Sequence, residues 1–215
     1  MDFKTKIIEF YGLPKTGKTT SANALQKYIV RDLGKKSILV IERAGVCPIK
    51  DKLHPSFNYW TVISFAKEYL QANDAGYDYI IADRGILDAY VWVHYLARRI
   101  SDLQYESSFK ELAFQKFLID NCLLSFYFTA SESTILEREY SRIVNKGSGK
   151  TSRIMNHEVL SEYSKSYSEI SETLKELCFT KVIDTTNTTD RDITNMVNSV
   201  AEEFIKHTTQ QLDTV

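Results

Sequence analysis

Hydrophobic residues along the chain fall into two alternating patterns. Short, nearly continuous apolar segments rich in Ile, Val, Phe and Tyr are separated by longer segments in which apolar residues recur every three or four positions. The first pattern predicts β-strands covered on both faces, and the second predicts amphipathic helices. We expect strands at Lys6–Tyr11, Ser37–Glu42, Tyr77–Asp83, Leu123–Thr129 and Lys181–Asp184.

The helical segments between these strands supply the crossover connections of a sheet. Alternation of strand and helix predicts an α/β fold, with a parallel sheet, right-handed crossovers and helices on both faces. Ligands of such sheets bind beyond the carboxyl ends of the strands, so the residues that close each strand are the first candidates for chemistry. The predicted helices are Lys18–Leu33, Tyr59–Asn73, Leu87–Ile100, Ser107–Asp120, Ser131–Asn145, His157–Leu177 and Asp190–His207.

Composition and charge narrow the class of protein. A chain of 215 residues fits a single domain, 1–215, and 43% hydrophobic with 26% charged residues is typical of a soluble globular protein. The net charge of −1 argues against broad nucleic-acid or membrane-surface binding. No apolar run approaches the ~18 residues of a membrane span, and no signal-peptide pattern is present, so we expect a cytoplasmic protein. The scattered Cys47, Cys122 and Cys178 indicate buried or inert thiols.

One glycine-containing turn carries the most specific chemical signal. Residues Gly12–Thr19 fit G-x-x-x-x-G-K-[ST], and the turn follows a predicted strand and precedes a predicted helix. Glycine lets the backbone curl so that N–H groups point at phosphate oxygens, and the helix N-terminus adds partial positive charge. Lys18 would reach the β- and γ-phosphates, and the Thr19 hydroxyl would ligate Mg²⁺. The residues expected to hold the triphosphate are Gly12, Lys15, Thr16, Gly17, Lys18, Thr19 and Thr20.

Two acid–arginine pairs follow predicted strands. Asp83-Arg84 ends the third strand and Glu42-Arg43 ends the second. Asp83 could hold Mg²⁺ through water or accept the proton of an attacking hydroxyl, and the arginines suit the charge that spreads during phosphoryl transfer. The alternative for each pair is a surface ion pair in a loop.

A basic stripe marks segment 131–155 as a candidate lid. Its members, spaced by three or four residues, are Arg138, Arg142, Lys146, Lys150 and Arg153. Like charges at this spacing repel on a helix unless an anion faces them, and we expect Glu137 and Glu139 to neutralise little of the stripe. The functional reading is a lid whose arginines close over the triphosphate and exclude water. The alternative is a solvated helix face.

Aromatic residues form a candidate acceptor wall, in which a planar ring could stack with Gln71 or another polar side chain reading its edge. Phe57 and Trp60 are the members that we assign to acceptor binding. Aromatics at helical spacing are also typical of a core, and His94 on the same apolar pattern indicates a satisfied core histidine. The full set is Phe57, Tyr59, Trp60, Phe65, Tyr69, Tyr90, Trp92 and Tyr95.

The order of these features resembles the thymidylate kinase and deoxynucleoside kinase superfamily. The similarity runs over about Lys4 to His207, and the P-loop is its most specific motif. The resemblance implies a five-stranded parallel sheet in the order 2-3-1-4-5 and ATP as the phosphoryl donor. This sequence departs from the pattern at Glu42-Arg43-Ala44, where thymidylate kinases carry Arg-Glu-Pro, and at Gly85, where Tyr or Ser is usual.

The resemblance also implies roles for individual residues. Lys18 and Thr19 match the P-loop lysine and hydroxyl. Asp83-Arg84 matches the pair beside the acceptor, and Glu42 matches the glutamate that serves deoxynucleoside kinases as base. Arg138 and Arg142 match the lid arginines, and Asp184–Thr189 would be the loop near the donor base.

The leading hypothesis is phosphoryl transfer from ATP·Mg²⁺ to a nucleoside or a nucleoside monophosphate. A nucleoside needs a base, Glu42 or Asp83, whereas a monophosphate needs Arg43 and Arg84 to position it. One alternative is a kinase for another small hydroxyl compound. Another is a regulatory NTPase without an acceptor, although Ile86 stands where a small GTPase needs glycine. The predicted helix Leu87–Ile100 could form a homodimer or pack internally.

Overall fold

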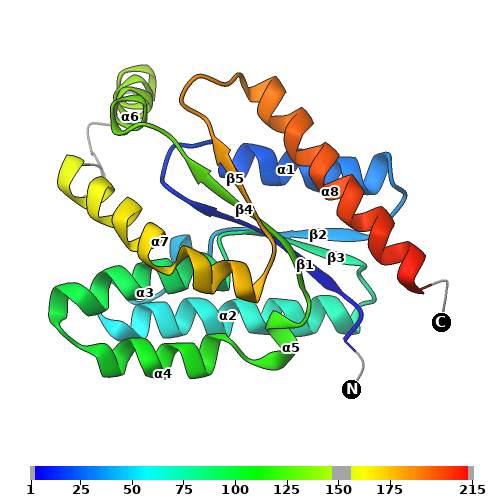
Figure 1. The fold of residues 1–215 in the computed structure, drawn as a ribbon, viewed down its shortest axis with the longest axis horizontal. Coiled ribbons are helices and arrows are strands. Elements are labelled where there is room, and N and C mark those ends of the chain that lie inside the picture. The colour runs from blue at the N-terminus through cyan, green and yellow to red at the C-terminus, as the bar shows by residue number, and fades with distance from the viewer. Residues whose placement is uncertain (1–2, 147–155, 213–215) are drawn as a thin grey trace.

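The computed structural model describes residues 3–146 and 156–212, which build an α/β fold around one sheet (Figure 1). The sheet has five strands in the order β2-β3-β1-β4-β5, and all four strand pairs are parallel. The predicted fold class and strand order are therefore confirmed. The strands are β1 (Lys6–Gly12), β2 (Ser37–Val40), β3 (Tyr79–Asp83), β4 (Cys122–Thr129) and β5 (Thr180–Asp184).

Helices cover both faces of this sheet (Figure 1). The first and last helices pack on one face and share a buried cluster with Ile8 and Phe10. The helices that follow β2 and β3, together with the helix at His157–Leu177, pack on the other face, around Ile7 and Tyr11. The helices are α1 (Lys18–Arg31), α2 (Pro55–Asp74), α3 (Ile86–Ile100), α4 (Leu103–Ala113), α5 (Lys116–Ile119), α6 (Glu132–Lys146), α7 (His157–Leu177) and α8 (Asp190–Leu212), with a short 3-10 helix, η1, at Arg43–Gly45.

The side chains of β1 alternate between the two faces of the sheet. Ile7, Glu9 and Tyr11 point to the face covered by α3 and α7, whereas Ile8 and Phe10 point to the face covered by α1 and α8. An acidic side chain therefore lies fully buried under the start of α3.

One predicted helix is wrong. The segment Ser107–Asp120 forms two helices, α4 and α5, because the backbone leaves the helical conformation at Phe114 and Gln115. Phe114 packs edge-on against Tyr90 with ring centroids 5.0 Å apart, and Leu118 is fully buried. Tertiary packing has here overridden a continuous helical pattern.

Two boundaries also shift. Strand β2 ends at Val40, so Glu42 lies two residues beyond the strand instead of closing it. Helix α2 begins at Pro55, four residues before the predicted start, with proline in its first turn and His54 Nδ1 accepting the Ser56 amide at 3.2 Å.

Most of the aromatic wall is core. Phe65, Tyr69 and Tyr90 are almost fully buried, and the Tyr69 hydroxyl donates to the Thr5 carbonyl at 3.1 Å. Helix α3 buries Leu87, Val91 and the other apolar side chains of its inner face within the chain. This face packs within the chain, so it is not available as the surface of a homodimer. A homodimer stays a prediction.

Within the residues that the structure describes, no helix is both long enough and apolar enough to cross a membrane.

Candidate active site

The turn between β1 and α1 has the backbone that its glycines predict. Gly12 has φ +115°, and a Cβ there would lie 2.3 Å from the Phe128 carbonyl oxygen, so no other residue fits without moving β4. Gly17 caps α1 with φ +89°, and Lys15 has φ +59°. The curled backbone leads directly into the N-terminus of α1, where partial positive charge gathers.

A pocket of about 260 Å³ opens over this turn. Every residue predicted to hold the triphosphate lines it except Gly12, which shapes the turn from beneath. Glu42 and Arg84 enter the same pocket from the ends of two neighbouring strands. The lining residues are Pro14, Lys15, Thr16, Gly17, Lys18, Thr19, Thr20, Glu42 and Arg84.

Lys18 is folded back into the turn. Its ammonium group donates to the Leu13 carbonyl and lies 3.4 Å from the Thr16 hydroxyl, and the residue is only 5% exposed. Burial, together with the nearby Arg84 charge, lowers the pKa of Lys18 to about 7. A polyphosphate would reverse this effect, since an anion favours the charged ammonium.

Thr19 and Asp83 form the candidate Mg²⁺ site. The Thr19 hydroxyl donates to Asp83 Oδ2 at 2.6 Å, and Asp83 is buried at the carboxyl end of β3, opposite Phe10 in β1. A hydroxyl and a carboxylate oxygen beside a phosphate cradle fit the oxygen ligands that Mg²⁺ prefers. The predicted pairing of these two residues is present in the structure.

Arg84 is held between two carboxylates. Its Nη1 lies 2.6 and 2.7 Å from the two Asp88 oxygens, and its Nε lies 3.3 Å from Glu42 Oε1. Burial alone would lower the pKa of Arg84, but the charges of Asp88 and Glu42 raise it above its usual range. The residue adopts φ +65°, a conformation that a non-glycine residue takes at some cost.

Asp88 is a functional candidate that sequence reasoning missed. Its Oδ1 accepts the Gly12 amide at 3.2 Å and the Tyr163 hydroxyl at 3.3 Å, in addition to Arg84. It therefore joins the phosphate turn, the pocket arginine and α7. The signal in the sequence was an acid in the first turn of a helix that begins just after the Asp83-Arg84 pair.

Glu9 was missed as well. This fully buried carboxylate accepts the amides of Gly85, Leu87 and Asp88 at 3.0, 3.2 and 2.9 Å, so it caps the N-terminus of α3 from inside β1. Desolvation raises the pKa of Glu9 to about 7, against the lowering by these three amides. An acid inside an otherwise apolar strand was the available signal, because a buried charge needs partners.

The structure does not bring every predicted acceptor residue to the pocket. Arg43 turns onto α2, with Nε 3.0 Å from the Ser64 hydroxyl and Nη2 3.5 Å from Glu68. Phe57 and Trp60 lie on α2 and are absent from the pocket lining.

The structure does not bring Gln71, suggested to read a base edge, to the pocket lining either. Gln71 lies in the last turn of α2, and its neighbour Asn73 accepts the Lys4 amide just before β1. That end of α2 is at the amino edge of the sheet, opposite the phosphate turn.

The first half of the candidate lid packs onto the phosphate turn. Arg138 Nη1 donates to the Lys15 carbonyl at 3.1 Å, and its Nη2 donates to the Thr185 carbonyl at 2.6 Å. Arg138 thus ties the turn to the loop after β5.

The expectation that Glu139 neutralises little of the stripe is wrong. Its buried carboxylate binds Arg142 at 2.8 and 2.9 Å and Lys15 at 2.9 Å. The hydrogen bond from Arg142 is the main reason that the pKa of Glu139 falls to about 2, although burial opposes it. Lys150 and Arg153 lie outside the described residues, as does the side chain of Lys146.

Both ring nitrogens of His94 have hydrogen-bond partners, as expected, but the partners are carboxylates outside the apolar core. Its Nδ1 lies 3.0 Å from Glu106 on α4, and its Nε2 lies 3.2 Å from Glu169 on α7. The histidine therefore joins three helices at the rim of the core.

The strand order 2-3-1-4-5, the glycine turn and the acid–arginine pair after β3 define the fold of P-loop nucleoside and nucleotide kinases. In particular, the chain is similar to a deoxyadenosine kinase from M. mycoides with bound dCTP, with a TM-score of 0.66 at 16% identity over 92% of this chain and 99% of that one. It is also similar to the thymidylate kinase of Candida albicans, with a TM-score of 0.60 at 14% identity over 96% of this chain and 95% of that one. No protein-family model and no curated protein matches the chain.

Proposed function

We propose that this protein is an ATP-dependent kinase that transfers the γ-phosphoryl group to a nucleoside or a nucleoside monophosphate, with Mg²⁺ as cofactor and in the cytoplasm. The observation that carries the proposal is the pocket in which Lys18, the Thr19–Asp83 pair, Arg84 and Glu42 converge on one glycine turn. The similar structures are those of a deoxyadenosine kinase and a thymidylate kinase, which supports the same class of acceptor.

Each group has a role that its position allows. Lys18 leaves the Leu13 carbonyl and binds the β- and γ-phosphates, while amides of the turn bind the remaining oxygens. Thr19 and Asp83 would hold the metal. Mg²⁺ there would neutralise negative charge on the triphosphate. Arg84 faces the transferred group from the end of β3.

Charges around the pocket favour a nucleoside over a nucleoside monophosphate as the acceptor. Arg84 is already neutralised by Asp88 and Glu42, and Arg43 by Glu68, so neither arginine is free for a second phosphate. The Glu42 carboxylate is 50% exposed, lines the pocket and can accept the proton of an attacking hydroxyl. A monophosphate acceptor would require Arg84 to leave Asp88.

The lid completes the proposal. Segment 131–155 would close over the triphosphate and keep water from the γ-phosphate, with α6 as its described part. Arg138 and Arg142 would stabilise negative charge there, Arg142 after exchanging Glu139 for a phosphate oxygen.

Replacing Lys18 tests the phosphate site. Lys18→Ala should lower kcat by about 10²–10³-fold, because it removes a positive charge aimed at the transferred group. The measurement is ADP release in the presence of nucleosides, with Lys67→Ala, an exposed lysine on α2, as the matched control. A Lys18→Ala protein that folds and turns over at the wild-type rate would show that the turn is not the donor site.

The acceptor is tested with a panel of deoxynucleosides, their monophosphates and other hydroxyl compounds. Glu42→Gln should lower kcat for nucleosides and leave a monophosphate acceptor unaffected, since a monophosphate needs no base. Turnover with another hydroxyl compound alone would favour a different small-molecule kinase. ATP hydrolysis that no acceptor stimulates would favour a regulatory NTPase.

A further inference from the structure

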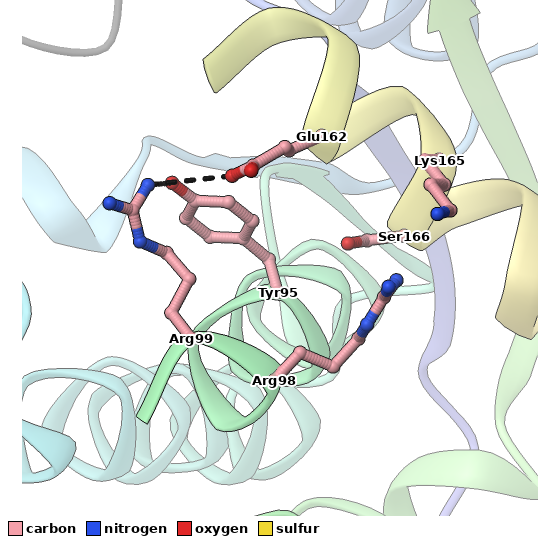
Figure 2. Close-up of a pocket in the computed structure, with 6 residues that line it drawn as sticks. All are labelled: Tyr95, Arg98, Arg99, Glu162, Lys165 and Ser166. Atoms are coloured by element: carbon pink, nitrogen blue, oxygen red, sulfur yellow. Dashed lines mark hydrogen bonds and ion pairs between the residues drawn. The ribbon is translucent and has the colours of Figure 1, made fainter. Parts of the chain in front are cut away.

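A second cavity lies between α3 and α7 (Figure 2). It encloses about 270 Å³ and shares no lining residue with the pocket over the turn. The volume exceeds the ~30 Å³ share of one water several-fold, so the cavity has room for a small ligand. Its lining residues are Tyr95, Arg98, Arg99, Glu162, Lys165 and Ser166.

Three cations line this cavity against one carboxylate. Arg98 pairs with Glu169, which also accepts from His94. Arg99 donates to the Tyr95 hydroxyl at 2.6 Å and makes only a long contact, 3.4 Å, with Glu162. Lys165 is exposed and has no hydrogen-bond or ion-pair partner among residues 3–146 and 156–212. The lining therefore has more positive than negative charge.

Ser166 supplies an independent sign that the cavity is a binding site. The residue is 1% exposed, yet its hydroxyl points into the cavity (Figure 2) and has no partner within the described part of the chain. Serines in helices usually bond to a carbonyl of the preceding turn, as Ser168 does to Ser164 at 3.1 Å. Ser166 instead leaves a hydroxyl donor that opens onto the cavity and is available to an occupant.

We propose that this cavity binds a phosphate group, either free phosphate or a phosphomonoester. Guanidinium, ammonium and hydroxyl donors are the groups that recognise phosphate oxygens, and here Arg99, Lys165 and Ser166 present all three types around one space. The acidic groups nearby are Glu162, Glu169 and, acting on Arg99 from the start of α7, Glu158. The phosphate takes the place of Glu162 at Arg99, whose present contact is long, and leaves the Arg98–Glu169 pair intact.

The test counts phosphate bound to the whole chain by equilibrium dialysis with labelled inorganic phosphate. The β,γ-imido analogue of ATP and Mg²⁺ are added first to fill the phosphate turn. We expect one phosphate per chain to remain bound, with an affinity that Lys165→Ala and Ser166→Ala each weaken about tenfold or more, as loss of a charge-assisted hydrogen bond implies. Lys67→Ala, a substitution of an exposed lysine on α2, should change nothing.

Thermal unfolding separates a binding role from a structural one. Ser166→Ala without phosphate should unfold at about the wild-type temperature, because the hydroxyl makes no hydrogen bond within the described part of the chain, but should lose the rise that phosphate produces. Unlabelled glycerol 1-phosphate and unlabelled phosphate are then compared as competitors for the labelled phosphate. If glycerol 1-phosphate competes at the lower concentration, the occupant is a phosphomonoester; if phosphate does, the occupant is free phosphate.

Several results would overturn the proposal. These are the absence of any phosphate beyond the turn, bound phosphate that neither substitution weakens, and equal displacement by chloride at matched ionic strength. Failure of the kinase proposal looks different, because the imido analogue would then leave phosphate binding at the turn unchanged.

Discussion

At the residue scale, the candidate site consists of buried charges that hold one another in place. Arg84 lies between Asp88 and Glu42, and Glu9 lies under three amides at the start of α3. Such groups are costly to bury alone, so removing one partner leaves another uncompensated. The close approach of Glu9 to the backbone also depends on the absence of a side chain at Gly85.

Gly85→Ala tests this close approach. A Cβ at position 85 would lie 2.7 Å from Glu9 Oε2, so the substitution should lower the free energy of unfolding by about 1–3 kcal/mol, as overpacking does. Gly45→Ala is the matched control, because a Cβ there meets nothing within 4 Å and should change stability by less than about 0.5 kcal/mol. Urea unfolding measures both, and equal values for the two variants would contradict the packing argument.

Sequence reasoning at this scale succeeded where the motif is local. Lys15–Thr20 could be expected at one pocket because they follow one another in a single turn, and the proximity of Thr19 to Asp83 followed from adjacent strands. Asp88 and Glu9 were missed because their partners come from distant parts of the chain, as in the bond from Tyr163 to Asp88. The pairing of Glu139 with Lys15 likewise joins residues far apart in the sequence, so spacing could not predict it.

At the scale of elements, α3 carries Asp88, the partner of the pocket arginine, and begins two residues after Arg84. Its N-terminal amides point into Glu9 instead of solvent, which couples the position of this helix to β1. The ionisation of one carboxylate therefore bears on how firmly the start of α3 is held.

Glu9 predicts a pH dependence of stability. Its pKa is raised from 4.5 to about 7 in the native state, so the native state binds this proton more tightly than the unfolded state. The contribution is fully stabilising below pH 4.5, declines as pH rises to 7 and is lost above it, with a slope of up to about 1.4 kcal/mol per pH unit. Lys18, whose pKa is lowered to about 7, makes stability depend on pH only above that window.

Glu9→Gln removes this titration, so stability should depend less on pH between 5 and 7 than in the wild type. Urea unfolding at pH 5, 6, 7 and 8 measures the difference in slope. Parallel curves for the two proteins would mean that the three amides keep Glu9 ionised throughout and that its native pKa is not raised.

Element prediction from the sequence was accurate for strands and less so for helix ends. Continuous apolar runs placed all five strands, because both faces of the sheet are covered. The break between α4 and α5 escaped, since Phe114 turns inward to pack on Tyr90 and no proline or glycine marks the place.

At the scale of the whole molecule, the phosphate turn joins the two layers. Gly12 packs against β4, its amide reaches Asp88 on one face, and α1 continues from the turn onto the other face. A ligand that orders this turn should therefore stabilise the fold on both sides of the sheet.

Saturation with ATP·Mg²⁺ should raise Tm. At 100 times its Kd a ligand stabilises by about 2.7 kcal/mol, which corresponds to about 5–11 °C for a chain of this size. Differential scanning calorimetry measures the shift, and Lys18→Ala should lose most of it while Lys67→Ala keeps it. A wild-type Tm that does not respond to ATP·Mg²⁺ would contradict nucleotide binding at the turn.

The guanidinium of Arg138 has a consequence for how a donor nucleotide would be recognised. It donates hydrogen bonds to the Lys15 carbonyl in the turn and to the Thr185 carbonyl in the loop after β5. On the proposed function, the polyphosphate would bind at the first place and the base near the second. Because one side chain holds both segments, binding of the base and binding of the polyphosphate are coupled. A substitution made near Thr185 to change base preference should also alter how tightly the polyphosphate tail is held.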